Sequence, residues 1–365
     1  MRSDRILNSG GVKSISCYHP LKMFYIGNYV DSAGVLHWNT KIVPFDTDHL
    51  EEDSQGNWWP VPTVTVGQCR AVAYRHFTIP CGKCIGCRLD YSRTWANRLM
   101  LEYKYYSPDE CWFVTLTYDN ENVPINYYCD SETGERRPSL SLRKRDFQLF
   151  NKSLRDNFGY RKIRYYLCGE YGEKTHRPHG HAIYFGLPLD PFKLVKWKVS
   201  DQGFTLYKCP ELEKIWSRGN VFVSSVSWET CAYVSRYVTK KLNGDAAKFY
   251  ELFNLEPEFS LMSRKPGIGR RYFDEHPDCI EKGIHLATDT RGFNFSAPRY
   301  FKSIWKLDNV IDSEYNAYNG SLRQDDLVAS QKAINDLARQ DYLVYLDNLE
   351  KEKRQISSSL RRSDI

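Results

Sequence analysis

The stretch YYLCGEYGEKTHRPHGHAIYF at residues 165–185 predicts two neighbouring strands that carry a metal site. Successive side chains of a strand point to opposite faces, so His179 and His181 lie on the same side and can bind one ion. Residues 182–185 form a short apolar and aromatic run, as expected for a strand. The upstream run ends at Glu170, whose carboxylate would complete a site with open positions for water or substrate. Two imidazoles and one carboxylate suit a divalent ion that must also touch a substrate oxygen.

The segment SWETCAYVSRYVTKKL at residues 227–242 predicts a helix that carries two tyrosines. Ser227 is a suitable N-cap, and Glu229 lies in the first turn, where the helix dipole favours an acid. At about 100° per residue one stripe of this helix is apolar, with Cys231, Val234, Val238 and Leu242. Tyr233 and Tyr237 fall on roughly the opposite side, away from that packing stripe.

The chemistry of these tyrosines depends on nearby positive charge. A phenol has a reference pKa of about 10, so it is a poor nucleophile at neutral pH. The cations Arg236, Lys240 and Lys241, or a metal ion, would help to supply the phenolate. The histidine strand and the tyrosine helix together are predicted to form one active site.

Length, charge and cysteine content limit the class of protein. A chain of 365 residues can bury a substantial core, in one large domain with appendages or in two domains. No stretch approaches about 18 uncharged apolar residues, and the N-terminus lacks a signal peptide, so we expect no membrane partner and a cytoplasmic location. The formal charge of +6 permits a nucleic-acid partner without arguing for one. The 11 cysteines are an odd number, which favours metal binding over disulfides for the clustered ones.

The motif PCGKCIGC at residues 80–87 is the strongest metal signal in the chain. Its glycines let the backbone curl around an ion that is bound by three thiolates, from Cys81, Cys84 and Cys87. The fourth ligand must come from elsewhere, with Cys17 as first choice and Cys69 and His19 behind it. We expect a structural zinc ion; an iron–sulfur cluster ranks lower because the proposed chemistry needs no redox centre.

The hydrophobic pattern between residues 88 and 245 predicts an α+β fold. The expected elements are a helix from residue 88 to Ser107-Pro108, strands at 111–118, 163–169, 179–185 and 221–226, a helix at 142–158, a short helix within 209–219, and the tyrosine helix. Residues 119–138 are predicted to be a polar loop. This order suggests a sandwich with helices on one face of a mainly antiparallel sheet.

The flanking segments have weaker patterns. Residues 1–80 are predicted to alternate β-like runs, at 23–30, 61–66 and 70–77, with polar turns. Residues 283–304 are predicted to contain a hairpin, and the chain from about residue 324 a polar helical tail. The predicted parts are 1–107, a β-containing region with the cysteine motif; 108–245, the core; 246–320, a basic loop and hairpin; and 321–365, the tail.

The stretch FSLMSRKPGIGRRYF at residues 259–273 is predicted to be a basic loop. Its proline and glycines oppose regular structure, and its cations suit a phosphate backbone. These cations are Arg264, Lys265, Arg270 and Arg271.

Three motifs in order resemble those of the HUH endonucleases, the rolling-circle replication initiators. They are FVTLT at 113–117, RPHGH at 177–181 and YVSRYVTKK at 233–241. Longer segments, which together span about residues 81–273, resemble the replication initiators of gokushovirus-like microviruses, small bacteriophages with circular single-stranded DNA. The resemblance implies an RRM-like sandwich with a Cys-rich N-terminal extension and a helical C-terminal tail.

The resemblance also implies roles for individual residues. It implies a metal site of His179, His181 and Glu170, with Glu173 and His176 as alternatives for the third ligand. It implies paired nucleophiles at Tyr233 and Tyr237, with Lys240 beside them and DNA contacts from Arg236, Lys241 and the basic loop. Gly180 departs from the family pattern, which usually has a hydrophobic residue between the histidines, so we expect a looser strand there.

The implied reaction is nicking of origin DNA with Mg or Mn. One tyrosine would form a 5′-phosphotyrosyl link and release a 3′-OH for a host polymerase, and the other would later help to close the circle. The sequence contains no GxxxxGK[ST] phosphate loop, so a host helicase would separate the strands of supercoiled origin DNA in the bacterial cytoplasm.

Simpler interpretations compete with each motif. Histidines spaced by two on a strand are often structural, a Tyr-x3-Tyr pair is usually packing, and three cysteines can be free buried thiols. The whole chain could be a non-catalytic zinc-containing DNA-binding or assembly protein on the same fold, which would bind DNA without cutting it. It could also be a related transposase or relaxase, which would join different DNAs.

Overall fold

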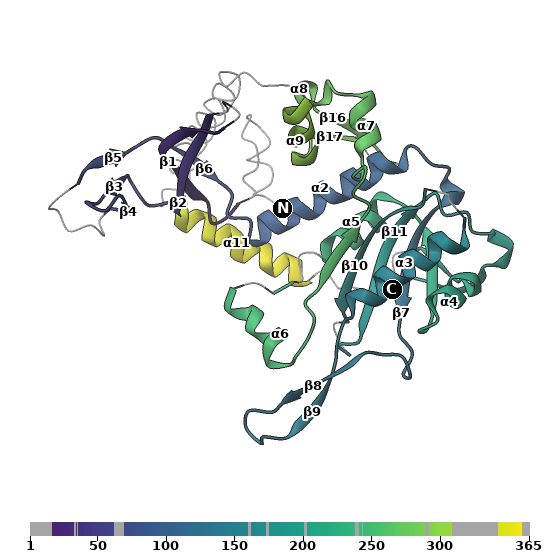
Figure 1. The fold of residues 1–365 in the computed structure, drawn as a ribbon. Helices are drawn as coiled ribbons and strands as arrows, with labels where there is room; N and C mark the ends of the chain where they lie inside the picture. Colours follow the sequence, from purple (N-terminus) through teal and green to yellow (C-terminus); the bar gives the residue numbers. More distant parts are fainter. Residues whose placement is uncertain are drawn as a thin grey trace. The chain divides into compact units, whose positions relative to one another are not determined.

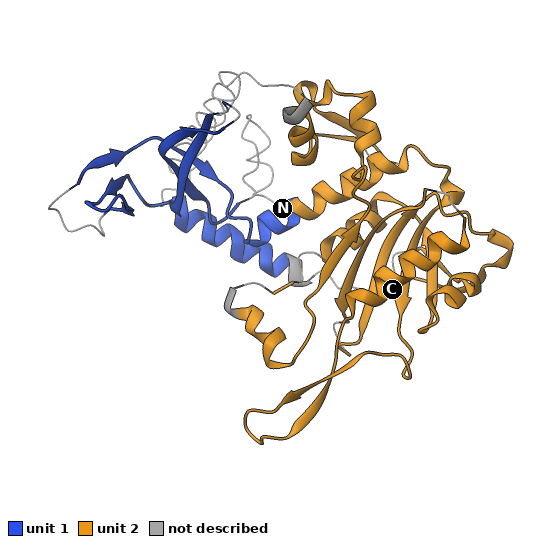
Figure 2. Ribbon diagram, viewed as in Figure 1, with its two compact units in different colours: residues 1–90, 310–361 blue, residues 91–309, 362–365 orange. Residues whose placement is uncertain are grey.

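The computed structural model describes residues 17–32, 34, 36–61, 69–159, 162–172, 175–200, 203–237, 241–242, 244–288, 292–308 and 342–359. The chain forms two compact units, residues 1–90 with 310–361 and residues 91–309 with 362–365 (Figure 2). The first unit therefore combines the two ends of the sequence. The four-part division expected from the sequence remains a prediction.

The second unit is built on a seven-stranded antiparallel sheet with the strand order β12-β13-β14-β7-β11-β10-β15 (Figure 1). Its strands are β7 Cys111–Thr117, β10 Arg164–Tyr171, β11 Pro178–Phe185, β12 Val195–Val199, β13 Thr205–Lys208, β14 Val221–Ser225 and β15 Phe259–Met262. The α+β class and the mainly antiparallel sheet are confirmed. The strands predicted at 111–118, 163–169, 179–185 and 221–226 are also confirmed.

Helices cover both faces of this sheet, so the prediction of helices on one face is wrong. Neighbouring residues of β7 point into different cores: Phe113 packs with helices α2 and α5, and Val114 with α3 and α4. These helices are α2 Ile85–Tyr103, α3 Lys144–Asn157, α4 Pro210–Trp216 and α5 Trp228–Arg236. The continuous apolar run of β7, CWFVTLT, is typical of a strand that is buried on both sides.

Three strands or strand pairs lie in segments expected to be loops. Strands β8 Ile125–Cys129 and β9 Arg136–Leu140 form a hairpin that extends from the end of the sheet (Figure 1). Their pattern is weak because they pair only with each other and stay largely exposed. Strands β12 and β13 extend one edge of the sheet, and the basic stretch 259–273 begins with β15, which pairs with β10 at the other edge.

The remainder of this unit is a small layer after the basic stretch. The predicted hairpin is confirmed as β16 Ile284–Ala287 and β17 Gly292–Phe295. The short helices are α6 Lys248–Leu252, α7 Arg270–Glu275, α8 Cys279–Lys282 and α9 Arg299–Asp308.

The first unit has two small sheets and a very small core. Its strands are β1 Leu21–Val30, β2 Leu36–Pro44, β3 Leu50–Glu52, β4 Trp58–Pro60, β5 Ala71–Ala73 and β6 His76–Ile79. Its buried apolar residues form one cluster of Phe24, Val43, Leu50 and Ala73. The predicted strand at 61–66 lies outside the described residues except for Val61.

The helical tail is confirmed for α11, Tyr342–Ser359, which buries Tyr342 and Leu346. The ring of Tyr342 lies 5.9 Å from that of Phe45, so the C-terminal helix completes the first unit. Within the described chain, no helix has both the length and the apolarity needed to cross a bilayer.

Candidate nicking site and cysteine cluster

The pairing of β10 with β11 brings the predicted metal ligands together. Glu170 is directly opposite His179, and Glu170 Oε1 lies 2.8 Å from His179 Nε2 and 3.1 Å from His181 Nε2. Ligand atoms about 2.1 Å from an octahedral ion lie about 3 Å apart, so this donor set fits Mg or Mn. Glu170 and His181 are buried, whereas 20% of the His179 side chain is exposed, which leaves one side open to a substrate.

The other nitrogen of each histidine is also held. His179 Nδ1 lies 3.1 Å from the Arg177 carbonyl oxygen, and His181 Nδ1 lies 3.0 Å from the Thr115 hydroxyl. When Nδ1 carries the proton and donates it to these oxygens, Nε2 is left to face a metal ion. The sequence analysis missed Thr115, although it lies within the FVTLT motif and its strand position is opposite His181.

The charge of Glu170 is stabilised by the histidines. Burial acts to raise the pKa of this carboxyl, but its hydrogen bonds with His179 and His181 outweigh burial and hold the pKa well below 4.5. The group at the centre of the triad is therefore an ionised carboxylate, the form that binds a divalent cation.

The alternatives for the third ligand have different outcomes. His176 is exposed and is not part of the group of ligand atoms, which all lie within 4.8 Å of one another. Glu173 lies outside the described residues. Among the residues that the structure describes, Glu170 is the carboxylate brought to the two histidines.

The glycine between the histidines is closely packed. A Cβ at Gly180 would lie 2.3 Å from Cε1 of Phe147, because the Phe147 ring from α3 fills the space behind the strand. The expectation of a looser strand is therefore wrong: the missing side chain of β11 is replaced by one from the facing helix.

The tyrosine helix begins as predicted. Ser227 Oγ accepts a hydrogen bond from Thr230 N at 3.2 Å, and Thr230 Oγ1 accepts one from Ser227 N at 2.8 Å, which is a capping box. The helix ends at Arg236 with Tyr237 as C-cap, earlier than the expected end at Leu242.

Both tyrosines contact His181. The Tyr237 ring stacks on the imidazole with centroids 5.0 Å apart and an interplanar angle of 11°, and the Tyr233 ring meets it edge-on at 5.2 Å. Tyr237 is only 6% exposed and belongs to the core, so the expectation that both tyrosines avoid packing is wrong for this one; Tyr233 is partly buried. Burial, with the nearby Glu170 charge, raises the pKa of Tyr237 well above 10.0.

The predicted DNA-contacting cations are spread over this unit. Lys240 lies outside the described residues. Arg236 and Lys241 are exposed near the end of α5, and Arg264 and Lys265 are exposed between β15 and α7. The remaining one, Arg270, forms an ion pair with Asp274 at 2.6 Å.

A second group of potential metal ligands lies in the first unit. Its thiols lie within 4.8 Å of one another and belong to Cys17, Cys81, Cys84 and Cys87. Tetrahedral zinc–thiolate sites place sulfurs about 3.8 Å apart, and Sγ of Cys81 and Cys87 are separated by 4.0 Å. Cys17 is therefore placed as the fourth member, whereas Cys69 is exposed and hydrogen-bonds to Ala71 O, and His19 pairs with Glu350.

The environment of the cluster suits thiolates that share a cation. Backbone N–H groups donate to sulfur, from Cys81 to Cys17 at 3.2 Å and from Tyr18 to Cys84 at 3.3 Å. The hydrogen bond between Cys17 and Cys84, followed by burial, raises the pKa of Cys17, whereas the same bond lowers that of Cys84. Four thiols this close cannot all ionise without a compensating cation, which zinc would supply.

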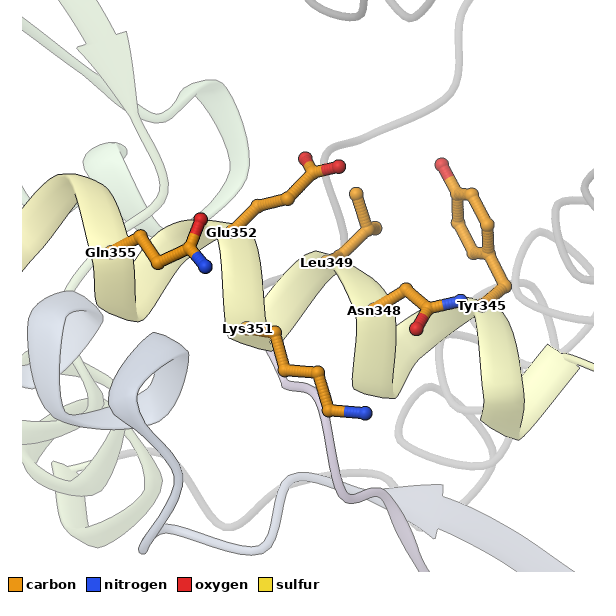
Figure 3. Close-up of a pocket in the computed structure, with 6 residues that line it drawn as sticks. All are labelled: Tyr345, Asn348, Leu349, Lys351, Glu352 and Gln355. Carbon is orange, nitrogen blue, oxygen red and sulfur yellow. The ribbon is translucent and has the colours of Figure 1, made fainter.

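A separate hollow of about 430 Å³ runs along α11. Figure 3 shows that its lining side chains all project from this one helix: Tyr345, Asn348, Leu349, Lys351, Glu352 and Gln355. It contains none of the residues predicted for either metal site.

Comparison with known proteins gives consistent matches. The sequence family described as replication-associated protein ORF2 matches residues 111–242, which include both histidines and both tyrosines. The chain is 32% identical over 298 residues to replication-associated protein ORF2 of Spiroplasma virus 4, covering 78% of this chain and 84% of the relative. It is 31% identical over 245 residues to replication-associated protein VP4 of Bdellovibrio phage phiMH2K, covering 64% and 69%.

A third relative is replication-associated protein ORF4 of Chlamydia phage 1, which is 28% identical over 291 residues and covers 75% of this chain and 64% of its own length. No solved structure matches the chain. The similarity is therefore to phage proteins that are named for DNA replication.

Proposed function

Because this chain belongs to the family of microvirus replication-associated proteins, we propose that it initiates rolling-circle replication by nicking single-stranded DNA at the phage origin. One observation carries the proposal: Tyr233 and Tyr237 both contact His181, which with Glu170 and His179 forms a site suited to a divalent ion. A nucleophile and a phosphate-binding cation would thus meet at one place.

In the proposed reaction a tyrosine oxygen attacks phosphorus in line and loses its proton to solvent. The bond from phosphorus to the 3′ oxygen breaks, the 3′ oxygen takes up a proton, and the 5′ phosphate stays on the tyrosine. A divalent ion, Mg or Mn, held by Glu170, His179 and His181 would offset charge that develops on the phosphate oxygens. The buried faces of the site orient the phenols beside this position.

The second tyrosine makes the reaction cyclic. The two rings lie 4.9 Å apart, so a strand could pass between them without leaving the site. After one round of synthesis by a host polymerase, the second tyrosine cuts the regenerated origin. The released 3′-OH then attacks the first phosphotyrosine, which closes the circle and frees that tyrosine. A host helicase would open the duplex in the bacterial cytoplasm, and zinc in the cysteine cluster would have a structural role.

Incubation of the purified protein with the circular single-stranded phage genome tests this function. With Mn present, a covalent protein–DNA adduct is expected on a denaturing gel, and chelation should remove it. Glu170→Gln should lower adduct formation at least about 100-fold, since loss of a residue that only orients a ligand already costs about 10- to 100-fold.

Three results would contradict the proposal in different ways. Binding without cleavage would indicate a DNA-binding or assembly protein, and transfer between two different DNA molecules would indicate a transposase or relaxase. An adduct that persists in chelator would exclude the metal role of the triad. Glu110→Gln, at an acid outside the triad, is the matched control and should behave as wild type.

Thr115→Val is expected to weaken the affinity for Mn about 10- to 100-fold. Valine has the same shape but removes the hydroxyl that holds His181 Nδ1, so the imidazole loses its orientation. Adduct formation measured against Mn concentration should shift to higher Mn and recover at saturation. Thr115→Ser keeps the hydroxyl and should restore the wild-type curve; an unchanged curve for Thr115→Val would show that this contact does not orient the ligand.

A further inference from the structure

A large basic hollow lies in the second unit, away from the metal triad. It has a volume of about 1220 Å³ and lies where the end of α3, the start of β10 and the loop between β15 and α7 meet. Its cations are Arg155, Lys162, Arg164, Arg264, Lys265 and Arg271, and its acids are Glu102 and Asp156. Positive charge from separate segments of the chain thus converges on one concave surface.

A buried ion pair forms the floor of this hollow and fixes its loop. Arg164 pairs with Glu102 and also donates to the carbonyl oxygens of Pro266 and Gly267, both at 2.9 Å. Glu102 accepts a further hydrogen bond from Gly269 N at 2.6 Å. The acid that could have neutralised the hollow is therefore occupied by Arg164, and the loop with Arg264 and Lys265 is held in place.

The rim of the hollow has an excess of positive charge. Arg155, Lys162, Arg264 and Lys265 are exposed, and within the described part of the chain none of the four forms an ion pair. One exposed acid, Asp156, faces them. Several exposed cations that are held around a concave surface without acidic partners suit a chain of phosphates better than a single small anion.

The position of the hollow relates it to the nicking site. Arg164 and Glu170 lie on the same strand, β10, six residues apart, which places them about 20 Å from each other. At about 3.4 Å per nucleotide of a stacked strand, this distance corresponds to about six nucleotides. One DNA strand can therefore reach both places.

We propose that this hollow binds the sugar–phosphate backbone of the DNA that flanks the nick, about six nucleotides from the scissile phosphate. This inference rests on the proposed nicking function for its register but adds a second, separate contact. The hollow would hold the DNA without regard to base sequence and keep it on the protein between the first and second cuts.

Binding of dT30 to the full-length protein, measured by fluorescence anisotropy without divalent ions, tests the proposal. The triple variant Lys162→Gln, Arg264→Gln, Lys265→Gln should weaken binding at least about tenfold at low salt. The slope of log K against log salt should fall by about 2, since each lost phosphate contact removes about 0.7 for single strands. Arg164 is left intact because it holds the loop.

A matched variant carries the same charge change elsewhere on the second unit, Lys152→Gln, Lys193→Gln, Lys214→Gln. It should keep the wild-type salt slope, and both variants should keep the wild-type melting temperature. A wild-type slope in the hollow variant, or equal losses in both variants, would overturn the proposal. Because no metal or cleavage is involved, failure of the adduct assay would count against the nicking function and not against this site.

Discussion

Replacing Tyr233 and Tyr237 together with Phe is expected to abolish the covalent DNA adduct while metal binding and the fold persist. Phenylalanine keeps both rings, which lie 5.2 Å and 5.0 Å from that of His181, and removes only the hydroxyls that would attack phosphorus. Loss of a nucleophile typically costs at least about 10³-fold in rate. Labelled single-stranded phage DNA with Mn, resolved on a denaturing gel, measures the adduct.

The single variants separate the two tyrosines. Tyr237 is 6% exposed and stacked on His181, whereas Tyr233 is partly buried and lies edge-on to the same ring. We therefore expect Tyr233→Phe to reduce the first cut more than Tyr237→Phe, and either single variant to block circle closure. Tyr207→Phe, on β13, is the control and should change neither step. A double variant that still forms the adduct would remove both tyrosines from the mechanism.

The site could be predicted from sequence because its signals are local. The histidines lie two residues apart on one strand, and Glu170 ends the adjacent strand, so alternation and a short connection suffice to bring them together. The tyrosines lie one turn apart on a helix whose N-cap, Ser227, is visible in the sequence. Each of these inferences needs the geometry of one or two consecutive elements.

The missed features depend on pairing between distant segments. Thr115 orients His181 only because β7 lies beside β11, and no local pattern distinguishes its hydroxyl from that of Thr117. Phe147 fills the space at Gly180 from another helix, so the glycine alone suggested a loose strand. The second covered face of the sheet and the return of α11 to the N-terminal unit likewise depend on contacts between residues far apart in the chain.

The cysteine cluster shows why a metal is expected in the first unit. Its described core is the small group of Phe24, Val43, Leu50 and Ala73, which is far less apolar surface than an independent domain normally buries. The cluster joins Cys17 to residues 81–87 across most of this unit. A bound ion would therefore supply folding energy that the core lacks.

Cys84→Ser is expected to release zinc and unfold the first unit while the seven-stranded sheet persists. Zinc binding to small domains is worth about 10 kcal/mol or more, so loss of one thiolate removes much of what holds this unit together. Elemental analysis should fall from one zinc ion per chain to none. In hydrogen exchange, peptides from β1, β2 and α11 should lose protection, whereas those from β7 and β11 should keep it.

Cys69→Ser provides the matched control, because Cys69 is exposed and its Sγ lies 3.1 Å from Ala71 O, outside the cluster. It should keep both the zinc ion and the protection pattern. Chelation of the wild type should reproduce the Cys84→Ser pattern, since both remove the same bonds. If Cys84→Ser loses zinc yet β1, β2 and α11 stay protected, the metal does not stabilise this unit, and its small core must be sufficient.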